Sequence, residues 1–201
     1  REELHVAFID IQMPEISGFE LAERLLQLHP HMQIVFVTAY QEYAVKAFEV
    51  NALDYLMKPV GPQRLSVALR RAAEARKRIE AARSDKPAMI CCLQSLRYKD
   101  RDGNIRMFAW RTYKAAELFA YMIHYRGKTV GKQELIDLLW PEYDTKRATA
   151  QLHTAVYQIR KIIDAAGLDL QIIYADRGYR LAWGSVALDL EEWENNIKQA
   201  P

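Results

Sequence analysis

The sequence contains only two cysteines, Cys91 and Cys92, and they are adjacent. Adjacent cysteines do not readily bridge each other, and there is no third cysteine to pair with either. A disulfide framework and a cysteine-based metal site are therefore excluded. Histidine is also scarce, and His124 and His153 lack acidic or cysteine partners at metal-ligand spacing, so we expect structural roles for both.

Long hydrophobic runs are absent as well. No apolar stretch approaches the roughly 18 to 20 residues needed to cross a bilayer. The first residues, Arg1 to Leu4, do not resemble the apolar core of a signal peptide. We therefore expect a cytoplasmic protein with no membrane partner. Half of the 201 residues are hydrophobic and 27% are charged, which is typical of globular proteins and allows two modest domains.

The small net charge of +2 conceals an uneven distribution. Residues 1–83 hold 11 basic and 11 acidic side chains, whereas residues 84–186 hold 16 basic and 11 acidic ones. A basic excess in the second half suits an anionic partner. It is weak evidence by itself, because such a charge also serves solubility.

The first part of the chain alternates short apolar strands with helical stretches. This alternation predicts an α/β domain over residues 1–83, with a parallel sheet and helices on both of its faces. A polar linker at residues 84–88 follows, where Pro87 ends the long helix. The expected strands are 4–9, 33–37 and 53–56, and the expected helices are 17–29, 42–49 and 62–83.

After the linker the pattern changes to an α+β arrangement over residues 89–186. Two strands around a turn at residues 100–104 are followed by three helices and a terminal hairpin, which is the order of a winged helix-turn-helix. Residues 187–201 form a further helical segment. The expected strands are 89–98, 105–110, 170–174 and 179–183, and the expected helices are 113–125, 131–139 and 145–166.

Three polar residues follow the three strands of the first domain. Asp10, Thr38 and Lys58 each come directly after an apolar run, so they should meet at one edge of the parallel sheet. A carboxylate can accept a phosphoryl group if a cation neutralises the transferred oxygens and a hydroxyl binds one of them. Taken singly, each residue has a structural interpretation as a turn cap or a solvent-facing strand end. Their joint placement favours a phosphoacceptor site.

The motifs around these residues resemble the receiver domain of bacterial two-component response regulators, which has a CheY-like, flavodoxin-like fold. The resemblance implies that a sensor histidine kinase phosphorylates Asp10 and that Lys58 pairs with the phosphoryl group. It also implies that Thr38 and Tyr55 are switch residues, and that Asp10 and the Gln12 backbone carbonyl bind Mg²⁺. The stretch 42–55 is closest to receivers of LytTR-type regulators. The motifs are Asp10-Ile11-Gln12-Met13-Pro14 with Gly18, Val37-Thr38-Ala39 and Asp54-Tyr55-Leu56-Met57-Lys58-Pro59.

The chain departs from that family at its start. A complete receiver begins with two more β-α units, and the first of these carries an acidic pair that binds the metal. Only three residues precede the strand at 4–9, so the acidic pair is absent. We expect weak or absent Mg²⁺ binding, weak phosphorylation and an unpaired strand edge. Truncation is the favoured explanation, and a second chain covering this edge is the alternative.

The helix at 145–166 shows two faces. Leu152, Val156, Ile159 and Ile163 repeat at helical spacing and predict a buried stripe. The opposite face holds side chains of the kinds that reach bases and phosphates in a major groove. A merely solvated face is the alternative, but such faces are usually richer in acids. The candidate DNA contacts are Arg147, Ala150, Thr154, Tyr157, Gln158 and Lys161, with Arg160 on the flank and Arg177 at the hairpin tip, where Gly178 is expected to serve the turn.

This second part resembles the winged helix of OmpR-type regulators in residues 128–140, 156–161 and 178–181. Residues 111–140 are closer to SARP-type antibiotic regulatory activators, in which a segment like 187–194 opens a helical-repeat domain. The resemblance implies binding of a homodimer to paired half-sites in double-stranded DNA. It also implies that the loop at 141–146 touches RNA polymerase, although an acidic loop equally suits solubility.

The sequence therefore predicts a DNA-binding transcriptional regulator of a two-component system, controlled by phosphorylation of Asp10. The main alternative is a phosphorylation-controlled protein interaction module that does not bind DNA. An aspartyl-phosphate hydrolase ranks last, because such enzymes usually place a second acid two residues after the nucleophile and this chain has Gln12 there. We expect no enzymatic activity beyond slow self-dephosphorylation.

Overall fold

The computed structural model describes residues 4–82 and 88–199. Its first sheet consists of β1 (Val6–Ile9), β2 (Gln33–Thr38) and β3 (Asp54–Met57), paired in that order and all parallel. The central strand β2 is buried on both faces. This is the parallel sheet that the alternating pattern predicts.

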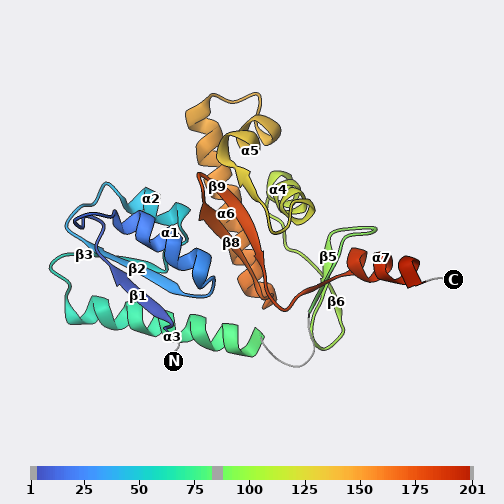
Figure 1. The fold of residues 1–201 in the computed structure, drawn as a ribbon, viewed down its shortest axis with the longest axis horizontal. Helices are drawn as coiled ribbons and strands as arrows, with labels where there is room; N and C mark the ends of the chain where they lie inside the picture. Colours follow the sequence, from blue (N-terminus) through green and yellow to red (C-terminus); the bar gives the residue numbers. More distant parts are fainter. Residues whose placement is uncertain (1–3, 83–87, 200–201) are drawn as a thin grey trace.

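Helices cover both faces of this sheet, as expected. α1 (Gly18–Leu28) and α2 (Ala44–Glu49) pack on the face that carries Ile34 and Phe36, and α3 (Pro62–Ala82) packs on the face that carries Val35. The two groups of helices lie on opposite sides of β1 to β3 in Figure 1. Because β2 sends apolar side chains to both faces, neither face is left without a helix.

The second part of the chain contains the three predicted helices and the terminal hairpin. These are α4 (Tyr113–His124), α5 (Lys132–Leu139), α6 (Thr145–Ala166), β8 (Leu170–Ala175) and β9 (Gly178–Trp183). A short strand that the sequence pattern does not reveal, β7 (Thr129–Gly131), pairs with β9. The stripe of Leu152, Val156, Ile159 and Ile163 on α6 is buried in one core with α4 and α5, as predicted.

The predicted strand at 89–98 is wrong, because the chain folds back on itself within it. β4 (Met89–Cys91) and β5 (Arg97–Lys99) are separate antiparallel strands, and β6 (Ile105–Met107) follows. The physical reason lies far along the sequence. The carboxylate of Asp189 accepts hydrogen bonds from the backbone nitrogens of Cys92 and Leu93, which fixes the turn between β4 and β5.

The C-terminal segment is also not purely helical. β10 (Ala187–Leu188) pairs with β4 in parallel before α7 (Asp189–Gln199) begins, so the second sheet has the order β10-β4-β5-β6. The predicted linker at 84–88 lies outside the described residues except for Ala88. The proposed domain limits thus remain predictions.

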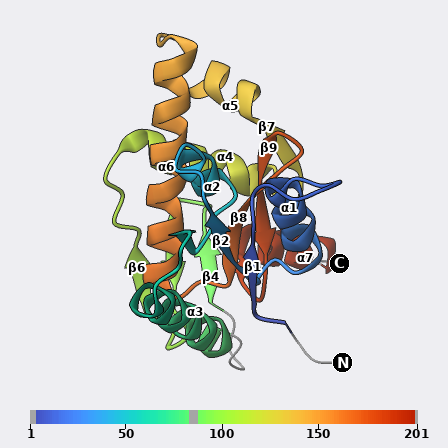
Figure 2. The same ribbon diagram turned by 90° about the vertical axis from the view of Figure 1, so that its left-hand side faces the viewer.

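The two parts of the chain share apolar contacts. α1 packs against β8, and Ile173 and Ala175 of β8 belong to the same buried cluster as Phe19 and Ile34. Figure 2 shows α1, α2, α6 and β8 gathered in the middle of the molecule. The first sheet therefore does not hang free from the second part. Within residues 4–82 and 88–199, no helix is both long and apolar enough to span a membrane.

Candidate phosphoacceptor site and recognition helix

The strand register brings Asp10 and Lys58 to one edge of the first sheet. Ile9 lies opposite Phe36, and Thr38 lies opposite Met57, so all three strands end at the same level. The Nζ atom of Lys58 donates a hydrogen bond to Oδ2 of Asp10 at 2.5 Å. The backbone nitrogen of Lys58 also donates to the carbonyl of Thr38 at 2.8 Å. The three predicted site residues are therefore neighbours.

Electrostatics keep the candidate phosphoacceptor ionised. The hydrogen bond from the Lys58 ammonium is the main cause that lowers the pKa of the Asp10 carboxyl. The two side chains remain 32% and 48% exposed, so a phosphodonor can reach them. An ionised, accessible carboxylate with a cation in contact has the properties required of a phosphoryl acceptor.

Gly18 explains how the loop after Asp10 is held. The backbone nitrogen of Gly18 donates to the carbonyl of Ile11 at 2.9 Å. A Cβ atom at this position would overlap the carbonyl oxygen of Asp10. Glycine is needed because the start of α1 approaches the backbone of the candidate phosphoacceptor this closely.

The predicted switch residues are linked to each other through Tyr40. Thr38 is completely buried, and its hydroxyl accepts a hydrogen bond from the backbone nitrogen of Tyr40 at 3.3 Å. The hydroxyl of Tyr55 donates to the carbonyl of Tyr40. The segment that carries Tyr40 leads directly into α2. A rearrangement at Thr38 or Tyr55 would thus reach α2 through a single short segment.

The described residues do not form a complete Mg²⁺ site. At this edge they offer the Asp10 carboxylate and the Gln12 backbone carbonyl, whereas Mg²⁺ requires about six oxygen ligands in octahedral geometry. Within residues 4–82 and 88–199, no cluster of three or more acidic, histidine or cysteine side chains could hold a metal. Mg²⁺ binding is therefore not part of the mechanism derived from these residues.

Asp54 is a site residue that the sequence pattern leaves unexplained. It is buried at the start of β3, and Arg64 donates two hydrogen bonds to its carboxylate, at 2.5 and 2.7 Å. Arg71 lies 3.3 Å away. Burial alone would raise the pKa of Asp54, but the bonds from Arg64 lower it overall. Arg64 and Arg71 are seven residues apart on one face of α3, a spacing that could have revealed this anchor.

The candidate DNA-reading face of α6 is mostly open to solvent. Figure 1 shows the N-terminal end of α6 projecting beyond the first sheet. The hairpin tip bends through Asp176 and Arg177, which both have positive φ, and Arg177 is exposed. Gly178 does not serve the turn as expected. It instead lets β7 approach, because a Cβ there would overlap the carbonyl of Val130. The exposed candidates on α6 are Arg147, Ala150, Thr154, Tyr157 and Lys161, and Gln158 is half-buried.

Arg160 is not on the solvent-facing flank, and this expectation is corrected by the structure. The side chain is buried, and its guanidinium donates to the carbonyl oxygens of Phe48 at 2.9 Å, Glu49 at 3.1 Å and Ile172 at 2.8 Å. Desolvation lowers its pKa to about 10, so it remains charged at neutral pH. Arg160 therefore caps the C-terminal end of α2, where a cation is favoured.

Three further contacts hold α2 against the second part of the chain. Glu49 Oε1 lies 2.8 Å from Nζ of Lys132 and 2.7 Å from Nε2 of His153. The rings of Phe48 and Tyr157 are 5.5 Å apart between centroids. We call this set the α2 clamp: Phe48 and Glu49 on one side, and Lys132, His153, Tyr157 and Arg160 on the other. It covers part of the candidate DNA-reading face.

Comparison with known proteins assigns both parts of the chain. Residues 1–70 match the family described as the response regulator receiver domain, and residues 109–181 match the family described as transcriptional regulatory protein, C terminal. The chain joins a receiver domain to a winged-helix transcriptional-regulator domain. The sequence resemblance is thereby confirmed for both domains.

Individual relatives are similar to the chain over part of its length. The sensory transduction protein LytR of Streptococcus agalactiae is 53% identical over 70 residues, which cover 34% of this chain and 28% of that protein. The transcriptional regulatory protein BtsR of Escherichia coli is 42% identical over 103 residues, which cover 51% of this chain and 41% of that protein. The chain thus spans well under half the length of these relatives. A CheY-like receiver domain protein of Methanospirillum hungatei is 34% identical with a TM-score of 0.35, over 38% of this chain and 63% of that one.

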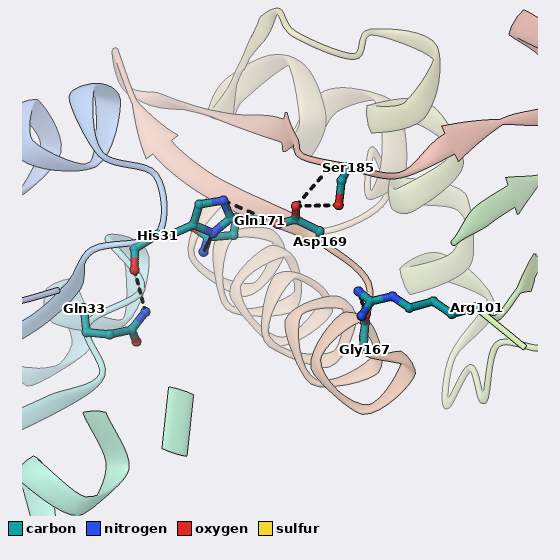
Figure 3. Close-up of polar contacts among 7 residues, drawn as sticks. All are labelled: His31, Gln33, Arg101, Gly167, Asp169, Gln171 and Ser185. Atoms are coloured by element: carbon teal, nitrogen blue, oxygen red, sulfur yellow. Dashed lines mark hydrogen bonds and ion pairs between the residues drawn. The ribbon is translucent and has the colours of Figure 1, made fainter. Parts of the chain in front are cut away.

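A second polar contact joins the receiver domain to the winged-helix domain. His31, which follows α1, lies with its Nε2 atom 3.4 Å from Asp169 and its Nδ1 atom 3.0 Å from Nε2 of Gln171 (Figure 3). The amide nitrogen of Gln171 can only donate, so Nδ1 accepts and Nε2 carries a proton toward Asp169. Ser185 also donates to Asp169, at 2.8 Å from its backbone nitrogen and 3.0 Å from its hydroxyl. The domains are therefore joined at two separate points.

The α2 clamp should depend on pH through Glu49. Burial opposes ionisation of this carboxylate, but His153 and Lys132 outweigh it and lower its pKa from 4.5 to about 2. A depressed pKa means that the stabilisation is fully present above pH about 4.5 and is lost as the pH falls toward about 2. In thermal unfolding, the difference between wild type and Glu49→Gln should be largest above this window and shrink within it. The exposed variant Glu117→Gln is the control, and a difference independent of pH would contradict the assignment.

Proposed function

We propose that the protein is a DNA-binding transcriptional regulator of a two-component system and that a histidine kinase phosphorylates it at Asp10. The observation that carries this proposal is the α2 clamp. It connects the helix that follows the switch segment to the helix with the candidate DNA-reading face. An input site and an output surface are thus joined through one short helix.

The geometry suggests how the input would reach the output. A phosphoryl group on Asp10 would engage the Lys58 ammonium and the Thr38 hydroxyl, because both lie at the same sheet edge. Moving Thr38 would disturb its bond to the Tyr40 nitrogen and, through Tyr40, the partner of Tyr55. The segment that leads into α2 would shift, and the clamp would loosen in favour of the open state.

Release of the clamp would complete the DNA-reading surface. Tyr157 and Arg160 are engaged by the receiver domain in this structure, while Arg147, Thr154 and Lys161 are exposed. With α6 in the major groove, Arg177 at the hairpin tip would reach phosphate or the minor groove. We expect a homodimer on paired half-sites, and contact of the loop at 141–146 with RNA polymerase. No enzymatic role is proposed beyond slow self-dephosphorylation.

Phosphorylation should be detectable and confined to Asp10. Incubation with acetyl phosphate and Mg²⁺ should add one phosphoryl group to a minor fraction of the chain, because the metal ligands present are incomplete. The measurement is intact-protein mass spectrometry. Asp10→Asn should abolish the added mass, whereas Glu15→Gln in the same loop should not. Complete single phosphorylation would show that no further residues are needed, and labelling that survives Asp10→Asn would remove Asp10 as the acceptor.

DNA binding should be electrostatic and depend on the exposed basic face. The affinity for a mixed-sequence duplex should fall about 100-fold between roughly 50 and 200 mM salt if four phosphates are contacted. The double variant Lys161→Glu/Arg177→Glu should lose binding in a fluorescence anisotropy titration. The control Arg24→Glu/Lys198→Glu changes the net charge equally but lies away from α6. Equal loss in both variants, or an affinity that does not respond to salt, would favour the protein interaction module.

Weakening the α2 clamp from the receiver side should strengthen DNA binding. Phe48→Ala removes the ring that covers Tyr157 and should tighten DNA binding about five-fold, because an aromatic pair contributes about 1 kcal/mol. Val45→Ala on the same helix is the matched control, since Val45 is 69% exposed. Both are measured by anisotropy in the unphosphorylated protein. Unchanged or weaker binding by Phe48→Ala would show that the clamp does not restrain the helix.

A further inference from the structure

A cavity of about 390 Å³ lies beside the C-terminal half of α6. Its walls come from α6, from β5 and β6, and from the segment that connects β6 to α4. Its volume falls within the range of small-molecule sites in proteins. The residues that line it are Tyr98, Met107, Phe108, Ala109, Arg111, Tyr157, Gln158, Lys161, Ile162, Ala165 and Ala166.

The inner part of this cavity is aromatic and well ordered by packing. Phe108 is only 5% exposed and is part of the winged-helix core. Its ring lies 4.9 Å from that of Tyr98 and 5.2 Å from that of Trp110, which fixes its orientation. Ile162 packs against the same core. The floor is therefore a preformed apolar surface that suits a flat aromatic body.

The rim of the cavity is polar and positively charged. Arg111 and Lys161 are both exposed there, and none of the described residues that line the cavity is acidic. The ammonium of Lys161 is 5.6 Å from the centroid of the Tyr157 ring, which keeps the charge beside the aromatic wall. Gln158 is held at the rim by a 3.1 Å hydrogen bond with the Thr112 hydroxyl. A carboxylate above the floor would meet two cations.

We propose that this cavity binds a small aromatic monocarboxylate, with its ring against Phe108 and its carboxylate between Arg111 and Lys161. Charge complementarity selects an anion, and the aromatic floor selects a planar apolar body. The rim also contains Tyr157, Gln158 and Lys161, which are candidate DNA contacts. An occupied cavity would thus compete with DNA for Lys161. Ligand binding itself does not rest on the proposed DNA-binding function, so the two can fail separately.

The test uses indole-3-acetate as the probe and ¹³C-methyl NMR of the methionines as the readout. The Met107 methyl should shift on titration with a Kd of about 1 mM or tighter. The methyl of Met122 should not shift, since that residue is buried in the core away from the cavity. Tryptophol, which has the same ring without the carboxylate, should bind at least about ten-fold more weakly because it lacks the charge-assisted bonds.

Variants assign the binding to this cavity. Arg111→Gln and Lys161→Gln should each weaken indole-3-acetate about ten-fold. Lys146→Gln, a cation near the opposite end of α6, should leave binding unchanged. Ala165→Trp should fill the cavity and abolish the Met107 shift, with circular dichroism verifying the fold. No saturable shift of Met107, equal affinity for tryptophol, or equal losses in the Lys161 and Lys146 variants would each overturn the proposal.

Discussion

The buried guanidinium of Arg160 is the contact on which the arrangement of the two domains depends. A charge removed from water must be compensated by hydrogen bonds, and breaking such a set typically costs about 3 to 5 kcal/mol. Arg160 finds its acceptors in three backbone carbonyls, two of which end α2 in the receiver domain. If α2 withdrew, the guanidinium would need new partners. Water or DNA phosphate could supply them, whereas an apolar surface could not.

This requirement makes the receiver domain and DNA alternative partners of one helix. α6 buries one stripe in its own core and has a second face for a partner. In this structure α2 occupies part of that face through Phe48 and Glu49. The two partners use similar chemistry, because the negative end of a helix and a phosphate both attract cations. The proposed regulation therefore needs no new binding surface.

The sequence predicts features set by local periodicity and misses those set by distant partners. Asp10, Thr38 and Lys58 could be placed together because each follows a strand, and parallel strands end at one edge. The buried stripe of α6 was likewise predictable from helical spacing. Arg160 was not, because its acceptors lie more than a hundred residues earlier in the chain. The split of residues 89–98 into two strands depends on Asp189, which is almost as remote.

The strength of the domain contact must match the size of the signal. Moving a two-state equilibrium from 1:99 to 99:1 requires about 5.5 kcal/mol of differential binding. A phosphoryl group at Asp10 could gain charge-assisted bonds to Lys58 and Thr38, each contributing about 1.5 to 3 kcal/mol. The domain contact mixes polar pairs with a small apolar patch around Ile173 and Ala175. A contact of this kind is weak enough for one phosphoryl group to shift, whereas a large apolar interface would not respond.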